Sequence, residues 1–274
     1  MASLNFEAPM TVNEVKKSFK SHKVLNGISF QMKKGEIYSL VGLNGIGKTT
    51  IIKIILGLLN ADGGKVLIFD KDNDNKLAKE NITYLPEKFS PSAFLKGHEF
   101  LSLSCSYYGK KYDVHEAREI CRKLNFDPMA LNRRVSGYSK GMGQKLGLVS
   151  VFLSRSPLLI LDEPMSGLDP SARIFLKHML KQYRDEGNSI FFTSHILADI
   201  EEICDRIGIL HDGDIYYEGT VDKFIKTYKT ENLEQAFLRA IDETAAITEK
   251  KKSVAIKLKK PKLASKQKAT KAEK

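Results

Sequence analysis

The strongest constraint on the fold is a glycine-rich segment at residues 42–49, which reads Gly-Leu-Asn-Gly-Ile-Gly-Lys-Thr. It fits the pattern G-x4-G-K-[ST], and it stands directly after a predicted strand at residues 36–41 and before a predicted helix from Lys48. Glycine lets the backbone curl until successive N–H groups converge on one point, where the following helix also directs its positive end. The segment therefore predicts an α/β fold with a phosphate-binding loop at the carboxyl end of a strand.

The side chains of this loop suggest a nucleotide rather than a bare phosphate. Lys48 supplies a full positive charge to β- and γ-phosphates, and the Thr49 hydroxyl can ligate Mg²⁺. The remaining residues expected around the phosphates are Gly42, Asn44, Gly45, Gly47 and Thr50. A glycine-rich turn that only caps a helix is the alternative, but the full pattern arises by chance in on the order of 1% of chains of this length.

Two adjacent carboxylates end a second apolar run, in which residues 158–161 are followed by Asp162 and Glu163. A buried strand can end in two acids only if they are compensated, and Mg²⁺ with water at the strand's carboxyl edge would do so. Neighbouring strand residues face opposite ways, so we expect Asp162 to face the metal and Glu163 a water aligned with the γ-phosphate. An ordinary strand followed by an acidic turn is the alternative, which the phosphate loop upstream disfavours.

The rest of the chain predicts the architecture. Residues 12–41 carry strand signals, and further short apolar strands are predicted at residues 82–85, 158–161, 189–193 and 206–210. Helical periodicity separates these runs, as in residues 171–183, and it dominates residues 89–152. The alternation predicts a mainly parallel sheet with flanking helices, an N-terminal antiparallel β portion and an inserted α-helical subdomain.

The motifs, taken in their order along the chain, resemble a known family. The phosphate loop is followed by Tyr-Ser-Lys-Gly-Met-Gly-Gln at 138–144, Leu-Leu-Ile-Leu-Asp-Glu-Pro at 158–164, Ser-Gly-Leu-Asp-Pro at 166–170 and Thr-Ser-His at 193–195. This succession resembles the ATP-binding cassette (ABC) nucleotide-binding domain over roughly residues 12–220. The resemblance implies a P-loop NTPase core, ATP and Mg²⁺ as cofactors, and ATP hydrolysis by a homodimer or a pair of cassette subunits.

The resemblance also implies a domain organisation. Residues 1–88 and 153–220 would form the nucleotide-binding core, and residues 89–152 the helical signature subdomain. C-terminal helices are expected within residues 221–249, at 221–228 and 233–241, and a Lys-rich disordered tail at residues 250–274.

Three residues are expected to act on the nucleotide of the partner cassette. In the family, the signature loop contacts the γ-phosphate that the partner holds, and here Ser139 and Gly141 would make this contact at a helix N-terminus. Asp169 would lie on a loop that crosses the dimer interface.

Three others would act on the chain's own nucleotide. Glu163 would be the general base that polarises the attacking water, and His195 would contact the γ-phosphate and hold the catalytic geometry. Phe19 stands where the family places an aromatic ring that stacks on adenine, and a core phenylalanine is the alternative.

The sequence departs from the usual family pattern at two positions. Lys140 replaces the first glycine of the signature and adds positive charge near the partner's phosphates. Glu87 stands where the family usually has glutamine, and its carboxylate can still ligate Mg²⁺. Glu87 after residues 84–86, together with Glu-Gly-Thr at 218–220, resembles the cassettes of type 2 exporters, which move drugs, lipids, polysaccharides or ions outward.

Composition constrains the cellular setting. The longest apolar runs are interrupted by Lys53 and Arg155, and the N-terminus shows no secretion signal, so we expect no membrane-spanning segment and no export. Cys105, Cys121 and Cys204 show no metal-binding spacing, which favours a reduced setting. We therefore expect a peripheral protein on the cytoplasmic face of a membrane, held by a separate transmembrane permease.

Two segments allow several interpretations. The aromatic-rich residues 89–112 would form either a groove for a coupling helix of the permease or the core of the helical subdomain. Residues 250–274 hold 11 Lys and one acid, which leaves a nearly neutral body. This tail would be solvated and disordered, attracted to an anionic membrane surface, or bound to nucleic acid, the last being disfavoured because it lacks Arg and aromatic residues.

The sequence therefore predicts the ATP-hydrolysing subunit of an ABC transporter, most simply an exporter. The alternative is a soluble ABC-type ATPase acting on nucleic acid or ribosomes. Translation-factor cassettes normally carry two copies in one chain, and chromosome-maintenance cassettes are split by long coiled coils, whereas neither feature occurs in this sequence. A small-molecule kinase with the same phosphate loop would not account for residues 138–142 or for His195.

Overall fold

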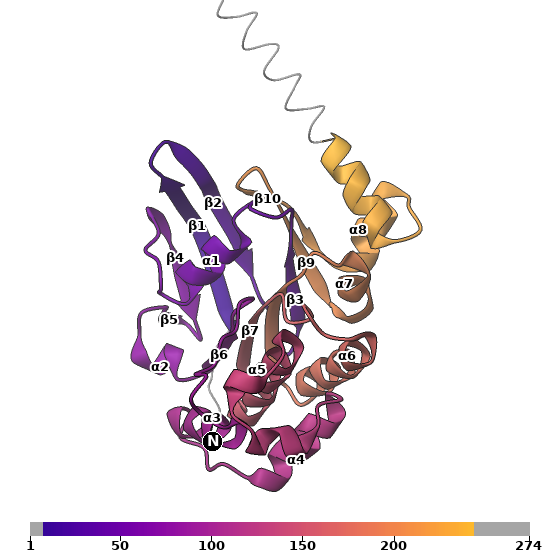
Figure 1. Cartoon of the computed structure of the whole chain (residues 1–274). Helices are drawn as coiled ribbons and strands as arrows, with labels where there is room; N and C mark the ends of the chain where they lie inside the picture. Colours follow the sequence, from indigo (N-terminus) through magenta and orange to yellow (C-terminus); the bar gives the residue numbers. More distant parts are fainter. Residues whose placement is uncertain (1–7, 244–274) are drawn as a thin grey trace, which may run out of the picture. The chain divides into compact units, whose positions relative to one another are not determined.

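A computed structural model of the chain describes residues 8–243, which divide into one unit ending at Phe224 and a second beginning at Ile225 (Figure 1). The predicted tail at residues 250–274 lies outside the described residues. Among residues 8–243, no helix combines the length and the apolar character that crossing a bilayer requires.

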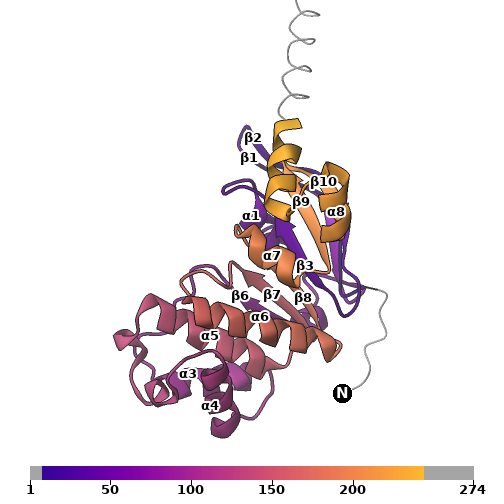
Figure 2. The same cartoon turned by 90° about the vertical axis from the view of Figure 1, so that its right-hand side faces the viewer.

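A six-stranded sheet forms the centre of the larger unit (Figures 1 and 2). Its order is β10-β9-β3-β8-β7-β6, with β3 at Ile37–Val41, β6 at Ile82–Leu85, β7 at Leu158–Asp162, β8 at Ser189–Thr193, β9 at Arg206–His211 and β10 at Asp214–Gly219. Every pair is parallel except β9 with the edge strand β10. All residues of β3, β7 and β8 are buried, as expected for parallel strands covered on both faces.

One face of this sheet packs on α1 (Lys48–Ile55) and on a second, antiparallel sheet. That sheet has the order β2-β1-β4-β5, with β1 at Met10–Phe19, β2 at His22–Gln31, β4 at Gly63–Ile68 and β5 at Lys71–Asp72. Helix α1 contributes apolar side chains at helical spacing to the core between the two sheets. The predicted combination of a parallel core and an N-terminal antiparallel portion is therefore confirmed.

The segment between β6 and β7 is helical, as predicted. It contains α3 (Gly97–Tyr107), α4 (Val114–Lys123), two short 3₁₀ turns (Pro128–Asn132 and Val135–Gly137) and α5 (Lys140–Ser154). Helices α5 and α6 (Pro170–Asp185) lie against β6 and β8 and cover the other face of the sheet (Figure 2). The predicted boundary of this helical subdomain at residues 89–152 stays a prediction.

Helix α7 (Leu197–Ile203) lies between β8 and β9, where a helical segment was predicted, whereas the short elements β4, β5, β10 and α2 (Lys76–Lys79) were not predicted from the sequence. Strand β10 forms a hairpin with β9 through Asp212 and Gly213, whose positive φ angles of 47° and 81° suit a two-residue turn. Helix α8 (Val221–Tyr228) and a helix over residues 233–243 occupy the positions predicted for the C-terminal helices.

A cluster of three aromatic rings lies in the core between the sheets. The rings of Phe30, Tyr38 and Phe191 are nearly parallel, and each ring centroid lies 5.4–6.0 Å from the other two. The Tyr38 hydroxyl is buried and has no hydrogen-bond partner among the described residues. It faces β9, where a Cβ atom on Gly208 would lie 2.3 Å from the Tyr38 Oη atom. The hydroxyl therefore makes glycine necessary at position 208.

We expect Gly208→Ala to lower the free energy of unfolding by about 1–3 kcal/mol, because the added methyl group overpacks the core. Tyr38→Phe should leave stability unchanged or raise it by about 1 kcal/mol, because it removes a buried polar group without a partner. In the Tyr38→Phe background, the cost of Gly208→Ala should fall, which urea denaturation measures. An equal cost in both backgrounds would contradict this account.

Candidate functional site

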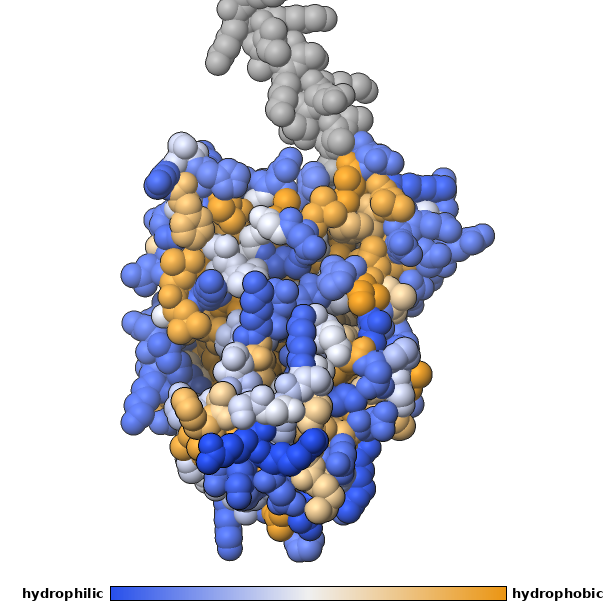
Figure 3. All heavy atoms as spheres, viewed as in Figure 1, coloured by the Kyte–Doolittle hydropathy of each residue, from blue (hydrophilic) through white to orange (hydrophobic). Residues whose placement is uncertain are grey.

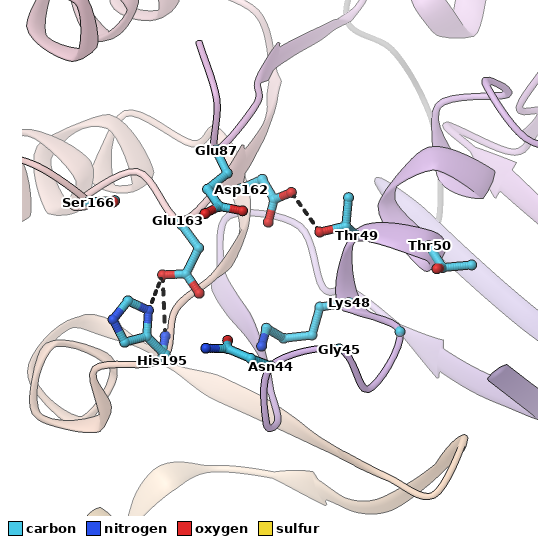
Figure 4. A pocket seen from close by; sticks show the side chains of 11 residues that line it. Asn44, Gly45, Lys48, Thr49, Thr50, Glu87, Asp162, Glu163, Ser166 and His195 are labelled. Atoms are coloured by element: carbon cyan, nitrogen blue, oxygen red, sulfur yellow. Dashed lines mark hydrogen bonds and ion pairs between the residues drawn. The ribbon is translucent and has the colours of Figure 1, made fainter. Parts of the chain in front are cut away.

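A cavity of about 300 Å³ opens where β3 and β7 end (Figure 4). Its lining consists of Asn44, Gly45, Gly47, Lys48, Thr49, Thr50, Glu87, Asp162, Glu163, Ser166 and His195. All of these except Ser166 are residues that the sequence analysis assigned to the nucleotide or the metal. Ser166 begins the Ser-Gly-Leu-Asp-Pro motif, so the motif itself was the signal that could have identified it.

The phosphate loop wraps around the start of α1. Gly45 and Gly47 have φ angles of 78° and 122°, a region of backbone space that suits glycine. A Cβ atom on Gly42 would lie 2.8 Å from the Leu210 carbonyl oxygen, so this position also needs glycine. The Lys48 Nζ atom donates to the Gly42 carbonyl at 2.7 Å and lies over the loop.

The environment of Lys48 is buried but rich in negative charge. Burial lowers the pKa of its ammonium group from the usual value, while the carboxylates of Glu163, Asp162 and Glu87 act in the opposite direction. The cavity therefore brings one buried cation and three carboxylates together.

The carboxylates of Asp162 and Glu163, at the end of β7, reach the cavity in a way that strand alternation alone does not explain. Strand β7 ends at Asp162, and Glu163 has a left-handed φ angle of 51°. This turn carries the Glu163 side chain back toward the cavity that Asp162 also lines (Figure 4). We expected strand alternation to turn Asp162 toward the metal and Glu163 toward a water at the same nucleotide; both side chains line one cavity, but the strand stops between them and the turn at Glu163 brings the second one there.

Each carboxylate has its own hydrogen-bond partners. The Asp162 Oδ2 atom accepts from the Thr49 hydroxyl at 3.1 Å, and its Oδ1 atom accepts from the Thr193 hydroxyl at 2.6 Å. The Glu163 Oε2 atom lies 2.8 Å from His195 Nδ1 (Figure 4). Thr193 does not line the cavity, and sequence reasoning missed its contact with Asp162, although it belongs to the Thr-Ser-His motif.

The residues at the cavity include the oxygen donors that Mg²⁺ prefers. Thr49 offers a hydroxyl, and Asp162 and Glu87 offer carboxylates. Within residues 8–243 no cluster of three His, Cys, Asp or Glu side chains could hold a metal alone. This donor set fits Mg²⁺, which is usually bound by one or two carboxylates together with phosphate oxygens and water.

The residues expected to act on a partner's nucleotide do not line this cavity. The Ser139 side chain caps α5 by accepting from the Met142 N–H at 3.2 Å. A Cβ atom on Gly141 would lie 2.9 Å from the Gly167 carbonyl oxygen, so glycine permits the close approach of α5 to this loop. Their predicted roles toward a partner stay predictions.

Asp169 is held within its own chain. Its Oδ2 atom accepts from Lys145 Nζ at 2.6 Å, and its Oδ1 atom accepts from the Ala172 N–H at 2.9 Å, which caps α6. The hydrogen bond from Lys145, followed by that from Ala172, holds the pKa of Asp169 at about 2.

Phe19 lies outside the cavity at the end of β1. Its side chain is 47% exposed, which excludes the core alternative. The ammonium of Lys17 lies 5.6 Å from the centre of its ring. An exposed ring at this position is available to a ligand, and its predicted contact with adenine stays a prediction.

Comparison with known proteins identifies the family. The family model described as ABC transporter matches residues 25–166. The lantibiotic transport ATP-binding protein SrtF of Streptococcus pyogenes is 30% identical over 230 residues, which cover 83% of this chain and 95% of that protein. The chain belongs to the ABC transporter family.

Other relatives agree with this assignment. An uncharacterized ABC transporter ATP-binding protein of Synechocystis sp. is 36% identical over 200 residues, or 72% of this chain. The match spans only 56% of that relative's length. A solved structure titled as the ATP binding subunit of an ABC transporter has a TM-score of 0.78 and 30% identity, covering 85% of this chain and 99% of its own. The predicted fold of an ABC cassette with a P-loop core is therefore confirmed.

The ion pair with Lys145 generates a prediction on pH. Because the pKa of Asp169 is lowered on folding, its contribution to stability is complete above the unfolded value near 4 and is lost as pH falls through about 2. We expect Lys145→Gln to raise the pKa of Asp169 toward its ordinary value, as measured by carboxyl ¹³C NMR titration. A pKa that stays at about 2 in this variant would show that the Ala172 N–H suffices.

Proposed function

We propose that this chain is the ATP-hydrolysing subunit of an ABC transporter, and that it powers a separate membrane permease, in the simplest case an exporter. The observation that carries the proposal is the convergence of the phosphate loop, Asp162, Glu163 and His195 on one cavity. Phosphate-binding groups and a candidate base thus lie within reach of the same ligand.

Phosphate binding would use groups that already point at the cavity. The N-terminus of α1 and the loop N–H groups offer backbone donors, and Lys48 offers a full charge. Of the other predicted ligand contacts, Phe19 would stack on adenine, and Gly42, Asn44, Gly45, Gly47 and Thr50 would surround the phosphates. The three carboxylates of the cavity would repel a bare triphosphate, so a cation must accompany the nucleotide.

Mg²⁺ would neutralise charge that develops on the phosphates. Thr49, Asp162 and Glu87 are the residues that would hold it, since their oxygen atoms line the cavity. Glu87 in place of the usual glutamine adds one negative charge to this group.

Glu163 would act as the general base. Its carboxylate is almost fully buried, faces the cavity and is held by His195 at 2.8 Å, so its orientation is set before a ligand arrives. His195 is partly exposed, which leaves it free to contact a γ-phosphate.

Hydrolysis would need two cassettes, as a homodimer or as a pair of related subunits. Ser139, Gly141 and Asp169 lie outside the chain's own cavity, which supports their assignment to a partner's nucleotide. ATP binding would close the pair, and hydrolysis would reopen it.

The helical segment provides surface for a membrane partner. Phe94 and Tyr107 are 84% and 80% exposed, and apolar residues reach the surface in the region of α3 (Figure 3). Phe89 and Phe100 are partly buried, and their rings contact edge to face. This mixture of exposed and partly buried aromatic residues supports a groove for a coupling helix at residues 89–112.

The exporter assignment rests on Glu87 and the neighbouring motifs, and on a relative that is named for lantibiotic transport. The permease would hold the chain on the cytoplasmic face of the membrane. The lysines of residues 250–274 would add attraction to an anionic leaflet, about 1 kcal/mol for each one near the surface.

Glu163→Gln is expected to bind ATP and to hydrolyse it about 10²–10⁴-fold more slowly, because the amide cannot accept a proton from water. Phosphate release measures turnover, and equilibrium binding of labelled ATP measures affinity. Wild-type turnover in this variant would refute the base assignment.

A matched control sharpens this experiment. Glu119→Gln changes an exposed acid on α4 and should leave turnover unchanged.

Lys48→Ala should weaken ATP binding more than tenfold. Its control is Lys53→Ala, which changes an exposed lysine of the same helix and should leave ATP binding unchanged.

The partner class is tested by purifying the tagged full-length chain from detergent-solubilised native membranes. We expect a protein with several membrane spans to co-purify, since the permease supplies the transmembrane path. Recovery of RNA or ribosomes without such a protein would instead support a soluble cassette ATPase.

A further inference from the structure

Thr193 occupies a central position that its motif does not explain. It is the last residue of β8, it pairs in register with Asp162 on β7, and its side chain is 0% exposed. Because it does not line the cavity, it makes no contact with a ligand there. Its hydroxyl instead contacts Asp162 and the backbone of Glu163, two of the three acidic residues that line the cavity.

The hydroxyl first fixes the orientation of Asp162. It donates to the Oδ1 atom at 2.6 Å, while the Thr49 hydroxyl donates to the Oδ2 atom at 3.1 Å. The carboxylate of Asp162 is 2% exposed and would be costly to bury without partners. With Oδ1 held from behind by Thr193, Oδ2 is turned to the side of Thr49 and the cavity.

The same residue also holds the backbone of Glu163. The Glu163 N–H donates to the Thr193 carbonyl at 3.1 Å and to the Thr193 hydroxyl at 3.2 Å. These bonds lie at the residue whose φ angle of 51° turns its side chain toward the cavity. A left-handed conformation at a residue other than glycine persists only when its surroundings hold it.

We propose that Thr193 is a positioning residue for ATP hydrolysis, whose single hydroxyl aligns Asp162 for Mg²⁺ and helps to hold the turn at Glu163. This inference rests on the proposed function. Groups that orient a metal ligand from behind typically change metal affinity or activity 10–100-fold when they are removed. Thr193 would therefore affect the metal without touching it.

Three substitutions separate this role from simple packing. Thr193→Val keeps the branched shape and loses the hydroxyl, whereas Thr193→Ser keeps the hydroxyl and loses a methyl group. Thr193→Cys keeps a weak donor of similar size. Positioning predicts that function falls in the order Ser, Cys, Val, while a packing role predicts that Val is tolerated best.

The main measurement is the Mg²⁺ concentration that half-saturates binding of a labelled, non-hydrolysable ATP analogue, so that hydrolysis does not interfere whatever the role of Glu163. We expect Thr193→Val to raise this concentration at least tenfold and Thr193→Ser to stay within about threefold of the parent. Binding of ATP without Mg²⁺ should be equal in all variants, which also shows that each one is folded. If Thr193→Val does not fold, Thr193→Cys decides, with an intermediate shift expected.

Thr83→Val is the matched control. Thr83 is also a buried threonine of this sheet, on β6, two strands away from β8, but its hydroxyl bonds Ser154 and Ser156 at 2.7 Å rather than a carboxylate. Its Mg²⁺ dependence should equal that of the parent. An unchanged Mg²⁺ dependence in Thr193→Val, or an equal shift in Thr83→Val, would overturn the proposal.

The two proposals fail separately. A tenfold shift in Thr193→Val together with wild-type turnover of Glu163→Gln would refute the proposed base and keep the link from Thr193 to Asp162. Loss of turnover in Glu163→Gln without a shift in Thr193→Val would refute the role of Thr193 and keep the proposed function.

Discussion

The parallel pairing of β3, β8 and β7 is the constraint on which the rest of the site depends. Parallel strands that lie side by side end at the same edge of the sheet. The phosphate loop follows β3, Asp162 ends β7, and His195 stands two residues beyond the end of β8. Segments that are more than a hundred residues apart in the sequence therefore meet at one cavity, because the sheet brings the ends of their strands together.

This arrangement concentrates charge at a buried edge, and hydrogen bonds compensate it. Lys48 donates to the carbonyl of Gly42, Asp162 accepts from two threonine hydroxyls, and Glu163 bonds His195. The side chains of Lys48, Asp162 and Glu163 are thus each held by hydrogen bonds within the chain, which limits the reorganisation needed when a ligand binds. Such preorganisation explains why polar residues occupy positions that apolar ones would fill at lower cost.

Helix α5 is joined to the segment that follows Glu163. The Gln144 side chain donates to the Pro164 carbonyl at 3.1 Å, and Lys145 pairs with Asp169 at 2.6 Å. Ser139 and Gly141, the residues predicted to contact a partner's nucleotide, therefore lie at the start of a helix that is hydrogen-bonded to the segment after Glu163. Residues from two separate sequence motifs are thus joined by direct hydrogen bonds.

The sequence by itself determined the motifs, their order and most strands, because these depend on residue type and local spacing. It identified ten of the eleven residues that line the cavity. The sequence did not predict short strands such as β4, β5 and β10, because their glycine and charged residues weaken the local strand signal. These strands are stabilised by pairing with their neighbours. Thr193 contacts Asp162 and the left-handed turn at Glu163, which lie about thirty positions away in the sequence. Only the tertiary structure decided these, because they depend on the register between β7 and β8, which local sequence does not encode.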